Sequence, residues 1–102
     1  MAKLVRDLIP QIIPQEKMHL FRFTEVSENE YANLLKQKLR EEIDEYLEAE
    51  NLEELADVYE VLEAIIKAKK FDVESLKNVQ IDKRLKRGGF EKRLLMEEVR
   101  CG

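Results

Sequence analysis

The stretch KLREEIDEYLEAENLEELAD, residues 38–57, decides the fold of this chain because it joins the end of one amphipathic segment to the beginning of the next. Between the two segments, Asn51 is followed three residues later by Glu54, a pattern typical of a helix N-cap. Two helices joined by so short a turn pack side by side in opposite directions. The stretch therefore predicts an antiparallel helical hairpin.

Two further capping signals extend this prediction along the chain. Ser27 with Glu30 forms a capping box, and Asp72 can cap a helix that stops at Gly88 and Gly89. The scarcity of Gly and Pro, with 3 and 2 residues in a chain of 102, agrees with a largely helical protein. We therefore predict helices over about residues 28–49, 52–69 and 73–87.

The segments outside these helices are short. Pro10 and Pro14 limit the first 14 residues to a loop with one helical turn. Residues 19–26 alternate between apolar and polar side chains, which predicts a strand, and residues 93–99 could pair with it. The expected fold class is thus all-α, a helical bundle with a small peripheral strand pair, in a single domain over residues 1–102.

Composition limits the possible partners and locations. The net charge of −4 and the lone aromatic residue among the basic residues 83–93, Phe90, argue against a nucleic-acid partner. No apolar run is long enough to span a bilayer, the N-terminus lacks an apolar signal core, and Cys101 has no partner for a disulfide. We therefore expect a cytoplasmic protein without a membrane partner. Because so few helices leave their apolar faces half covered, we also expect a homo-oligomer.

The first helix carries acidic residues on two faces. With residues about 100° apart, the apolar stripe is centred on Leu39, and Glu42, Lys38 and Glu45 fall inside the apolar arc. Other acidic residues fall on the opposite side, where we expect solvent: Glu41, Asp44 and Glu48. Glu42 and Glu45 are therefore the acidic residues of this helix that we assign to its packing face.

The second helix repeats the arrangement. Its predicted core stripe consists of Leu55, Tyr59, Leu62 and Ile66. Glu54 lands within the apolar arc and Asp57 at its edge, so Asp57 is expected to be the least buried of the four carboxylates. In an antiparallel hairpin the two acidic pairs would approach each other, repel, and favour a bound cation. All-oxygen ligands favour Mg²⁺ or Mn²⁺.

The acidic pairs, Glu42-x-x-Glu45 and Glu54-x-x-Asp57, resemble those of the all-α nucleoside triphosphate pyrophosphohydrolases. That superfamily includes the MazG proteins, the dimeric dUTPases and the phosphoribosyl-ATP pyrophosphohydrolases. The strings KLVRDLIP at 3–10 and KRGGFEK at 86–92 resemble a smaller group within it, described as phosphoribosyl-ATP pyrophosphohydrolase-like or house-cleaning pyrophosphatases. The resemblance covers nearly the whole chain. One departure is the stretch of eight residues between the acidic pairs, shorter than in many members.

The resemblance implies a MazG-like domain that hydrolyses a nucleoside triphosphate to a monophosphate and pyrophosphate. It implies a dimer or tetramer, and Mg²⁺ held by Glu42, Glu45, Glu54 and Asp57. For the mechanism itself, we expect Glu42 or Glu45 to act as general base, and Lys38, which shares the acidic stripe, to help hold the triphosphate. Further residues would bind the triphosphate or the base: Lys3, Arg6, Arg84, Lys86, Arg87, Gly88, Gly89 and Phe90. The resemblance leaves the substrate base open.

Structural interpretations of the same residues remain open. Glu54 could serve only the Asn51 cap, and Glu42 could only pair with Lys38. Arg6 could tie the N-terminal segment to the helices. In the same way, Gly88-Gly89 could be a plain helix stop, and the basic residues before it a solvated face. For the whole protein, the alternative to an enzyme is a non-catalytic helical module that binds nucleotide or regulates a partner.

Overall fold

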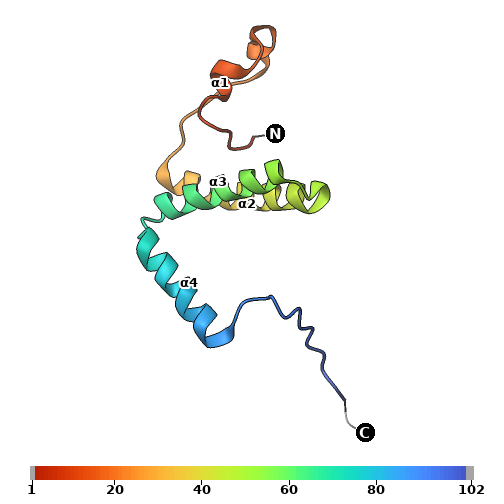
Figure 1. Cartoon of the computed structure of the whole chain (residues 1–102). Coiled ribbons are helices and arrows are strands. Elements are labelled where there is room, and N and C mark those ends of the chain that lie inside the picture. Colours follow the sequence, from red (N-terminus) through yellow and green to blue (C-terminus); the bar gives the residue numbers. More distant parts are fainter. Residues whose placement is uncertain (1, 101–102) are drawn as a thin grey trace. The chain divides into compact units, whose positions relative to one another are not determined.

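The computed structural model describes residues 2–100. Helices are the regular elements among these residues, and they contain no strand. The elements are α1 (Ile9–Ile12), the 3₁₀-helix η1 (Gln15–Leu20), α2 (Glu28–Ala49), α3 (Leu52–Ala68) and α4 (Val73–Arg87) (Figure 1). The all-α prediction is confirmed. The chain divides into two compact units, Met1–Lys70 and Phe71–Gly102, and the single domain remains a prediction. Cys101 lies outside the described residues.

All three predicted N-caps are present. The side chains of Ser27, Asn51 and Asp72 accept hydrogen bonds from the backbone N–H groups three residues ahead. Each bond satisfies one of the free donors at a helix start. The bounds of α2 and α4 therefore agree with the prediction, and α3 ends one residue earlier than predicted. Between α2 and α3 lies a minimal turn, in which Glu50 adopts a left-handed conformation with φ of 50°.

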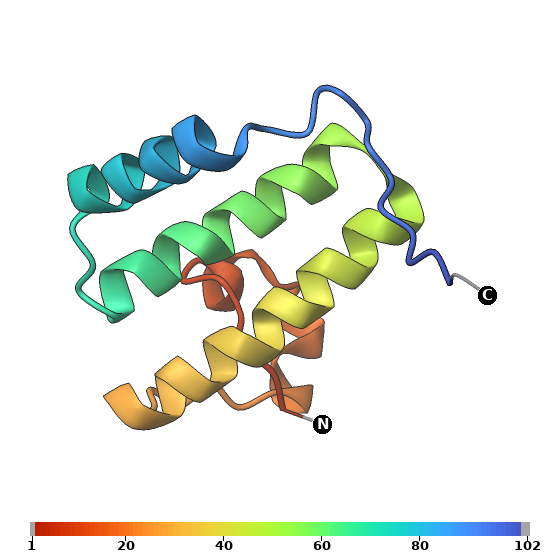
Figure 2. The same ribbon diagram turned by 90° about the horizontal axis from the view of Figure 1, so that it is seen from below.

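The first unit is built on the antiparallel hairpin of α2 and α3, which lie side by side in Figure 2. Its centre is small: Leu35 on α2 and Val61 on α3 are the buried apolar residues. Residues 3–6 of the N-terminal segment are tied to both helices by ion pairs, Lys3 to Glu41 on α2 and Arg6 to Asp57 on α3, whereas α1 and η1 extend away from the hairpin (Figure 1). The N-terminal segment is thus held to the hairpin by acidic residues of α2 and α3.

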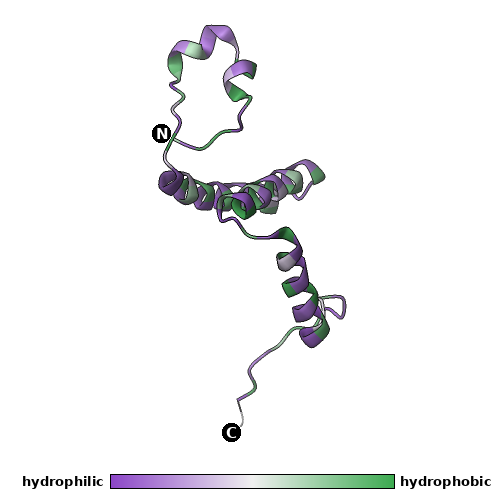
Figure 3. Cartoon of the chain, turned by 90° about the vertical axis from the view of Figure 1, so that its left-hand side faces the viewer, coloured by the Kyte–Doolittle hydropathy of each residue, from purple (hydrophilic) through white to green (hydrophobic). Residues whose placement is uncertain are grey.

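The predicted core stripe of α3 is wrong. Leu55, Tyr59 and Leu62 are exposed, whereas Val61 is buried. Around Val61, within about 60° on the helix, lie Glu54, Asp57, Val58, Ala64 and Ile65. Because α3 has apolar residues on most of its circumference, their distribution alone did not identify the packed side. Apolar and polar residues alternate along both helices of the hairpin (Figure 3), and several of the apolar ones are exposed.

The predicted strand pair is also wrong. Residues 15–20 form η1, residues 21–27 are extended without pairing, and residues 93–99 form neither helix nor strand. Alternation alone cannot make a strand, because the backbone groups need a paired neighbour. The sequence pattern therefore predicted strands wrongly at both residues 19–26 and residues 93–99.

The second unit contains α4 and the segment that follows it. The helix ends at Arg87, and Gly88 has a φ of 82°, which a residue without a side chain adopts readily. Its N–H donates to the carbonyl of Arg84 at 2.7 Å. The interpretation of Gly88 as a helix stop is therefore confirmed. Within the second unit, every residue of α4 is exposed.

None of the helices formed by residues 2–100 is both long and apolar enough to cross a bilayer.

Candidate metal centre

Three carboxylates meet where α2 and α3 face each other. Glu42 comes from α2, and Glu54 and Asp57 come from the first turns of α3. One carboxylate oxygen from each lies within 4.8 Å of the others, a grouping that could hold a metal ion. Three of the four predicted metal ligands are therefore brought together by the pairing of the two helices.

The burial of these carboxylates distinguishes them from the other acidic residues except Glu41. Glu42 is 7% exposed, and among residues 2–100 it is the charged residue that is buried. Its Oε2 and the Oε2 of Glu54 are both buried without a hydrogen-bond partner. Buried carboxylate oxygens are costly unless a cation or a donor satisfies them. The hard oxygen donors and their unsatisfied charge therefore fit a divalent cation such as Mg²⁺ or Mn²⁺.

Glu45, the fourth predicted ligand, lies in a second group with Glu41 and Glu42. It is exposed, so the expectation that Asp57, which is half-buried, would be the least buried of the four is wrong. The negative charge of Glu42, followed by a hydrogen bond with the same residue, raises the pKa of Glu45. A raised pKa makes a carboxylate a stronger base near neutral pH.

The prediction that Glu41 faces solvent is wrong. Glu41 is half-buried and pairs with Lys38 at 3.3 Å and with Lys3 at 3.7 Å. Its spacing of three residues from Lys38 was a signal of the first pair, but no pattern indicated the second, because Lys3 comes from the distant N-terminal segment. With two cations near it, Glu41 is less suited than Glu54 to bind a metal.

Lys38 pairs with Glu42, the residue that the two groups share, and with Glu41. Its Nζ is 3.2 Å from Glu42 Oε1, so Glu42 has one oxygen on a cation and the other free. Burial alone would lower the pKa of Lys38, but the hydrogen bonds and charges of Glu42 and Glu41 together raise it. Lys38 therefore stays positively charged beside the cluster.

The N-terminal segment adds a second cation. Arg6 Nη2 lies 2.6 Å from Asp57 Oδ1, so Arg6 does tie this segment to the hairpin. A cleft of about 550 Å³ lies beside this contact. Its lining includes Arg6, Lys38, Glu42 and Asp57, together with apolar residues of the N-terminal segment. The cleft thus brings cations, carboxylates and an apolar wall together at one place.

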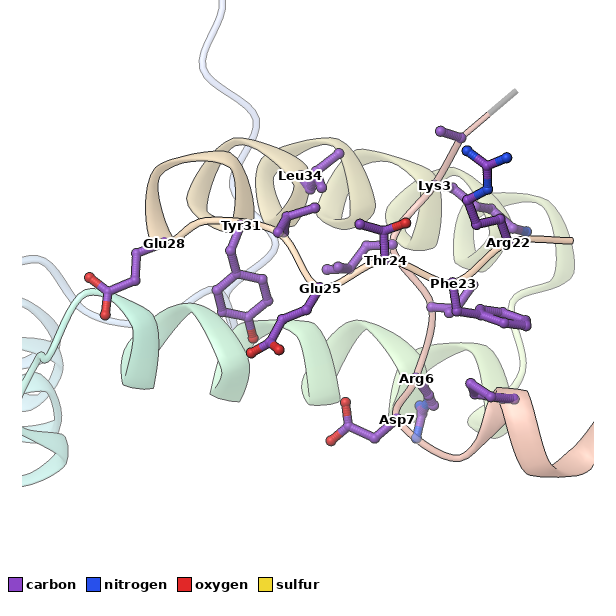
Figure 4. A pocket seen from close by; sticks show the side chains of 15 residues that line it. Lys3, Arg6, Asp7, Arg22, Phe23, Thr24, Glu25, Glu28, Tyr31 and Leu34 are labelled. Atoms are coloured by element: carbon purple, nitrogen blue, oxygen red, sulfur yellow. The ribbon is translucent and has the colours of Figure 1, made fainter.

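A neighbouring cavity of about 760 Å³ shares part of this wall. Figure 4 shows it between the N-terminal segment with Lys3 and Arg6, the segment that carries Phe23, and the beginning of α2 with Tyr31. Residues 4–7 and Tyr31 line both hollows. The first unit therefore has two adjoining spaces, with Arg6 in the wall between them.

The other predicted substrate residues belong to the second unit. There Arg84 pairs with Glu91, and Lys86 pairs with Asp82 at 3.0 Å. A backbone hydrogen bond and then the bond from Arg84 lower the pKa of Glu91. Arg87, Gly89 and Phe90 are exposed. The role of this group in substrate binding stays a prediction.

Comparison with known proteins gives no match to a family model, to a curated protein or to a solved structure. The resemblance to the all-α pyrophosphohydrolases therefore rests on the motifs of the chain itself.

Proposed function

We propose that this protein is a house-cleaning nucleoside triphosphate pyrophosphohydrolase that depends on Mg²⁺, or on Mn²⁺ in its place. The observation that supports this most strongly is the pair of buried, unpartnered oxygens of Glu42 and Glu54, grouped with Asp57. The proposal places a MazG-like enzyme in the cytoplasm. Its substrate would be a standard or modified nucleoside triphosphate, converted to a monophosphate and pyrophosphate.

In this proposal Glu42, Glu54 and Asp57 hold the cation. Once bound, a divalent cation neutralises phosphate oxygens and lowers the pKa of a water molecule. Glu45 lies in the adjoining group with Glu41 and Glu42, and its exposed carboxylate would accept a proton from the attacking water.

Positive side chains would hold the rest of the triphosphate. Lys38 and Arg6 line the cleft beside the carboxylates, and Lys3 lines the neighbouring cavity. Phosphoryl transfer depends mainly on positioning and on charge stabilisation, which such cations provide. The apolar lining of the two spaces would accept the nucleoside.

Release of pyrophosphate from a panel of standard and damaged nucleoside triphosphates tests the proposal. We expect release from at least one nucleotide with Mg²⁺ or Mn²⁺ and none with a chelator. Glu42→Gln should reduce the rate at least about a hundredfold, in the range found when a group that stabilises the reacting phosphate is lost. Glu48→Gln is the matched control, because Glu48 is exposed on the same helix.

Full activity of Glu42→Gln would show that the cluster is not the catalytic site. If no nucleotide is cleaved but the chain binds one, the protein is instead a nucleotide-binding module.

The oligomeric state is part of the same proposal. Leu55, Tyr59 and Leu62 on α3 and Leu47 on α2 are exposed in a chain that buries few apolar residues. Association with a second copy of the chain would remove these apolar side chains from water. Sedimentation equilibrium should therefore show a dimer or tetramer, and Leu62→Glu should shift it toward the monomer. A chain that is monomeric at high concentration would contradict this.

A further inference from the structure

Asp57 belongs to two arrangements at once. One of its oxygens is grouped with those of Glu42 and Glu54. Its Oδ1 also accepts a hydrogen bond from Arg6 at 2.6 Å, across 51 positions of sequence. A cation held by the carboxylate group would therefore lie close to a guanidinium group.

The charges decide how these two arrangements affect each other. A guanidinium group stays protonated at all ordinary pH values, so it repels a divalent cation on the same carboxylate. Arg6 could instead orient Asp57 and so assist metal binding. However, the side chains of Arg6 and Asp57 are 58% and 40% exposed, and an ion pair so exposed holds its carboxylate only weakly in one orientation. Repulsion between two positive charges needs no fixed geometry, so we take it as the larger effect.

A polyphosphate changes this balance. Its oxygens offer a guanidinium group paired, charged acceptors, which bind it more strongly than a single carboxylate oxygen does. Arg6 lines the cleft that contains the carboxylates and the adjoining cavity, so both spaces are within its reach. A phosphate chain bound with a cation in the cleft would thus meet Arg6.

We infer that Arg6 exchanges partners, from the Asp57 carboxylate to a phosphate group, and that the site thereby favours a cation–polyphosphate complex over the bare cation. The inference rests on the proposed function only in taking the ligand to be a polyphosphate. Arg6 is a positioning and selectivity residue in this account, and Asp57 is freed when the phosphate binds.

The test compares Arg6→Gln with the unsubstituted chain in two titrations. The first follows Mn²⁺ alone by electron paramagnetic resonance, and the second follows inorganic tripolyphosphate with Mn²⁺ by calorimetry. Arg6→Gln should bind bare Mn²⁺ about threefold more tightly. It should bind the Mn²⁺–tripolyphosphate complex about tenfold more weakly. Arg6→Lys, which keeps the charge, should stay close to the unsubstituted chain with Mn²⁺ alone.

Arg40→Gln is the matched control, because Arg40 is exposed on α2 and forms no ion pair with any of residues 2–100. It should leave both titrations unchanged. Three results would overturn the inference. Arg6→Gln could bind bare Mn²⁺ more weakly than the unsubstituted chain does, the two chains could have equal affinities in both titrations, or the unsubstituted chain could bind no Mn²⁺. Since tripolyphosphate is not a nucleotide, the expected result would stand even if no nucleotide were hydrolysed, and only the proposed enzyme would then fail.

Discussion

Lys38 and Glu42, one helical turn apart on α2, form an ion pair of 3.2 Å whose carboxylate has its second oxygen buried without a partner. Their side chains are 17% and 9% exposed, so solvent screens this pair less than the other ion pairs of residues 2–100. Lys38 therefore gives the buried Glu42 carboxylate a cationic partner in the packed face. Glu42 in turn keeps a free oxygen for a ligand.

Removal of Lys38 should expose the cost of this arrangement. Lys38→Met leaves the Glu42 carboxylate buried without its cation, which should lower the free energy of unfolding by about 1–3 kcal/mol. Adding Glu42→Gln removes the charge and should restore most of that loss. Urea denaturation of both single variants and the double variant gives the coupling directly. Additive effects would mean that the pair is not coupled.

The hairpin should depend strongly on its few buried apolar residues. Leu35 is 3% exposed, and Leu35→Ala should cost about 2–3 kcal/mol by leaving a cavity between α2 and α3. Gln37, on the same helix, is exposed and provides the control. Thermal unfolding of Gln37→Ala should resemble that of the unsubstituted chain. Equal effects of the two substitutions would contradict the packing described here.

The sequence predicted the parts of the fold that depend on local chemistry. Ser27, Asn51 and Asp72 act within one turn of their own helices, so the helix starts followed from residue type and spacing. The prediction of a strand over residues 19–26 was wrong, because a strand forms only when a partner distant in the sequence pairs with it.

The candidate site was likewise predicted only where its residues depend on local sequence. The position of Glu42 followed from the narrow apolar stripe of α2. On α3 the apolar residues surround the helix, so Val61 could not be distinguished from Leu55. The contacts of Lys3 and Arg6 depend on how the N-terminal segment lies on the hairpin, and spacing in the sequence does not contain that information.

The helix α4 should depend on its N-cap, because Asp72 satisfies donors that the first helical turn leaves free. Asp72 accepts hydrogen bonds from both the N–H and the hydroxyl of Ser75. Asp72→Ala should therefore destabilise α4 by about 1 kcal/mol. Hydrogen exchange of residues 73–87 should accelerate in this variant and stay unchanged in Gln80→Ala.

The acidic cluster should make stability fall as pH rises. The pKa of Glu45 is raised from its ordinary value of 4.5, chiefly by the charge of Glu42. The folded chain therefore holds this proton to higher pH than the unfolded chain does, and stability is lost as pH rises from 4.5 through the raised pKa. Glu45→Gln should weaken this decline and raise the melting temperature at neutral pH. Melting curves across that range, with Glu48→Gln as control, measure it.

The adjacent residues Glu53 and Glu54 offer the most direct test that the carboxylate cluster holds a divalent cation. Both lie in the first turn of α3, but Glu53 is exposed, whereas Glu54 has a buried, unpartnered oxygen beside Glu42 and Asp57. Calorimetric titration of Mn²⁺ should show affinity at least about tenfold weaker in Glu54→Gln. In Glu53→Gln the affinity should equal that of the unsubstituted chain. Equal affinity in all three chains would contradict the metal site.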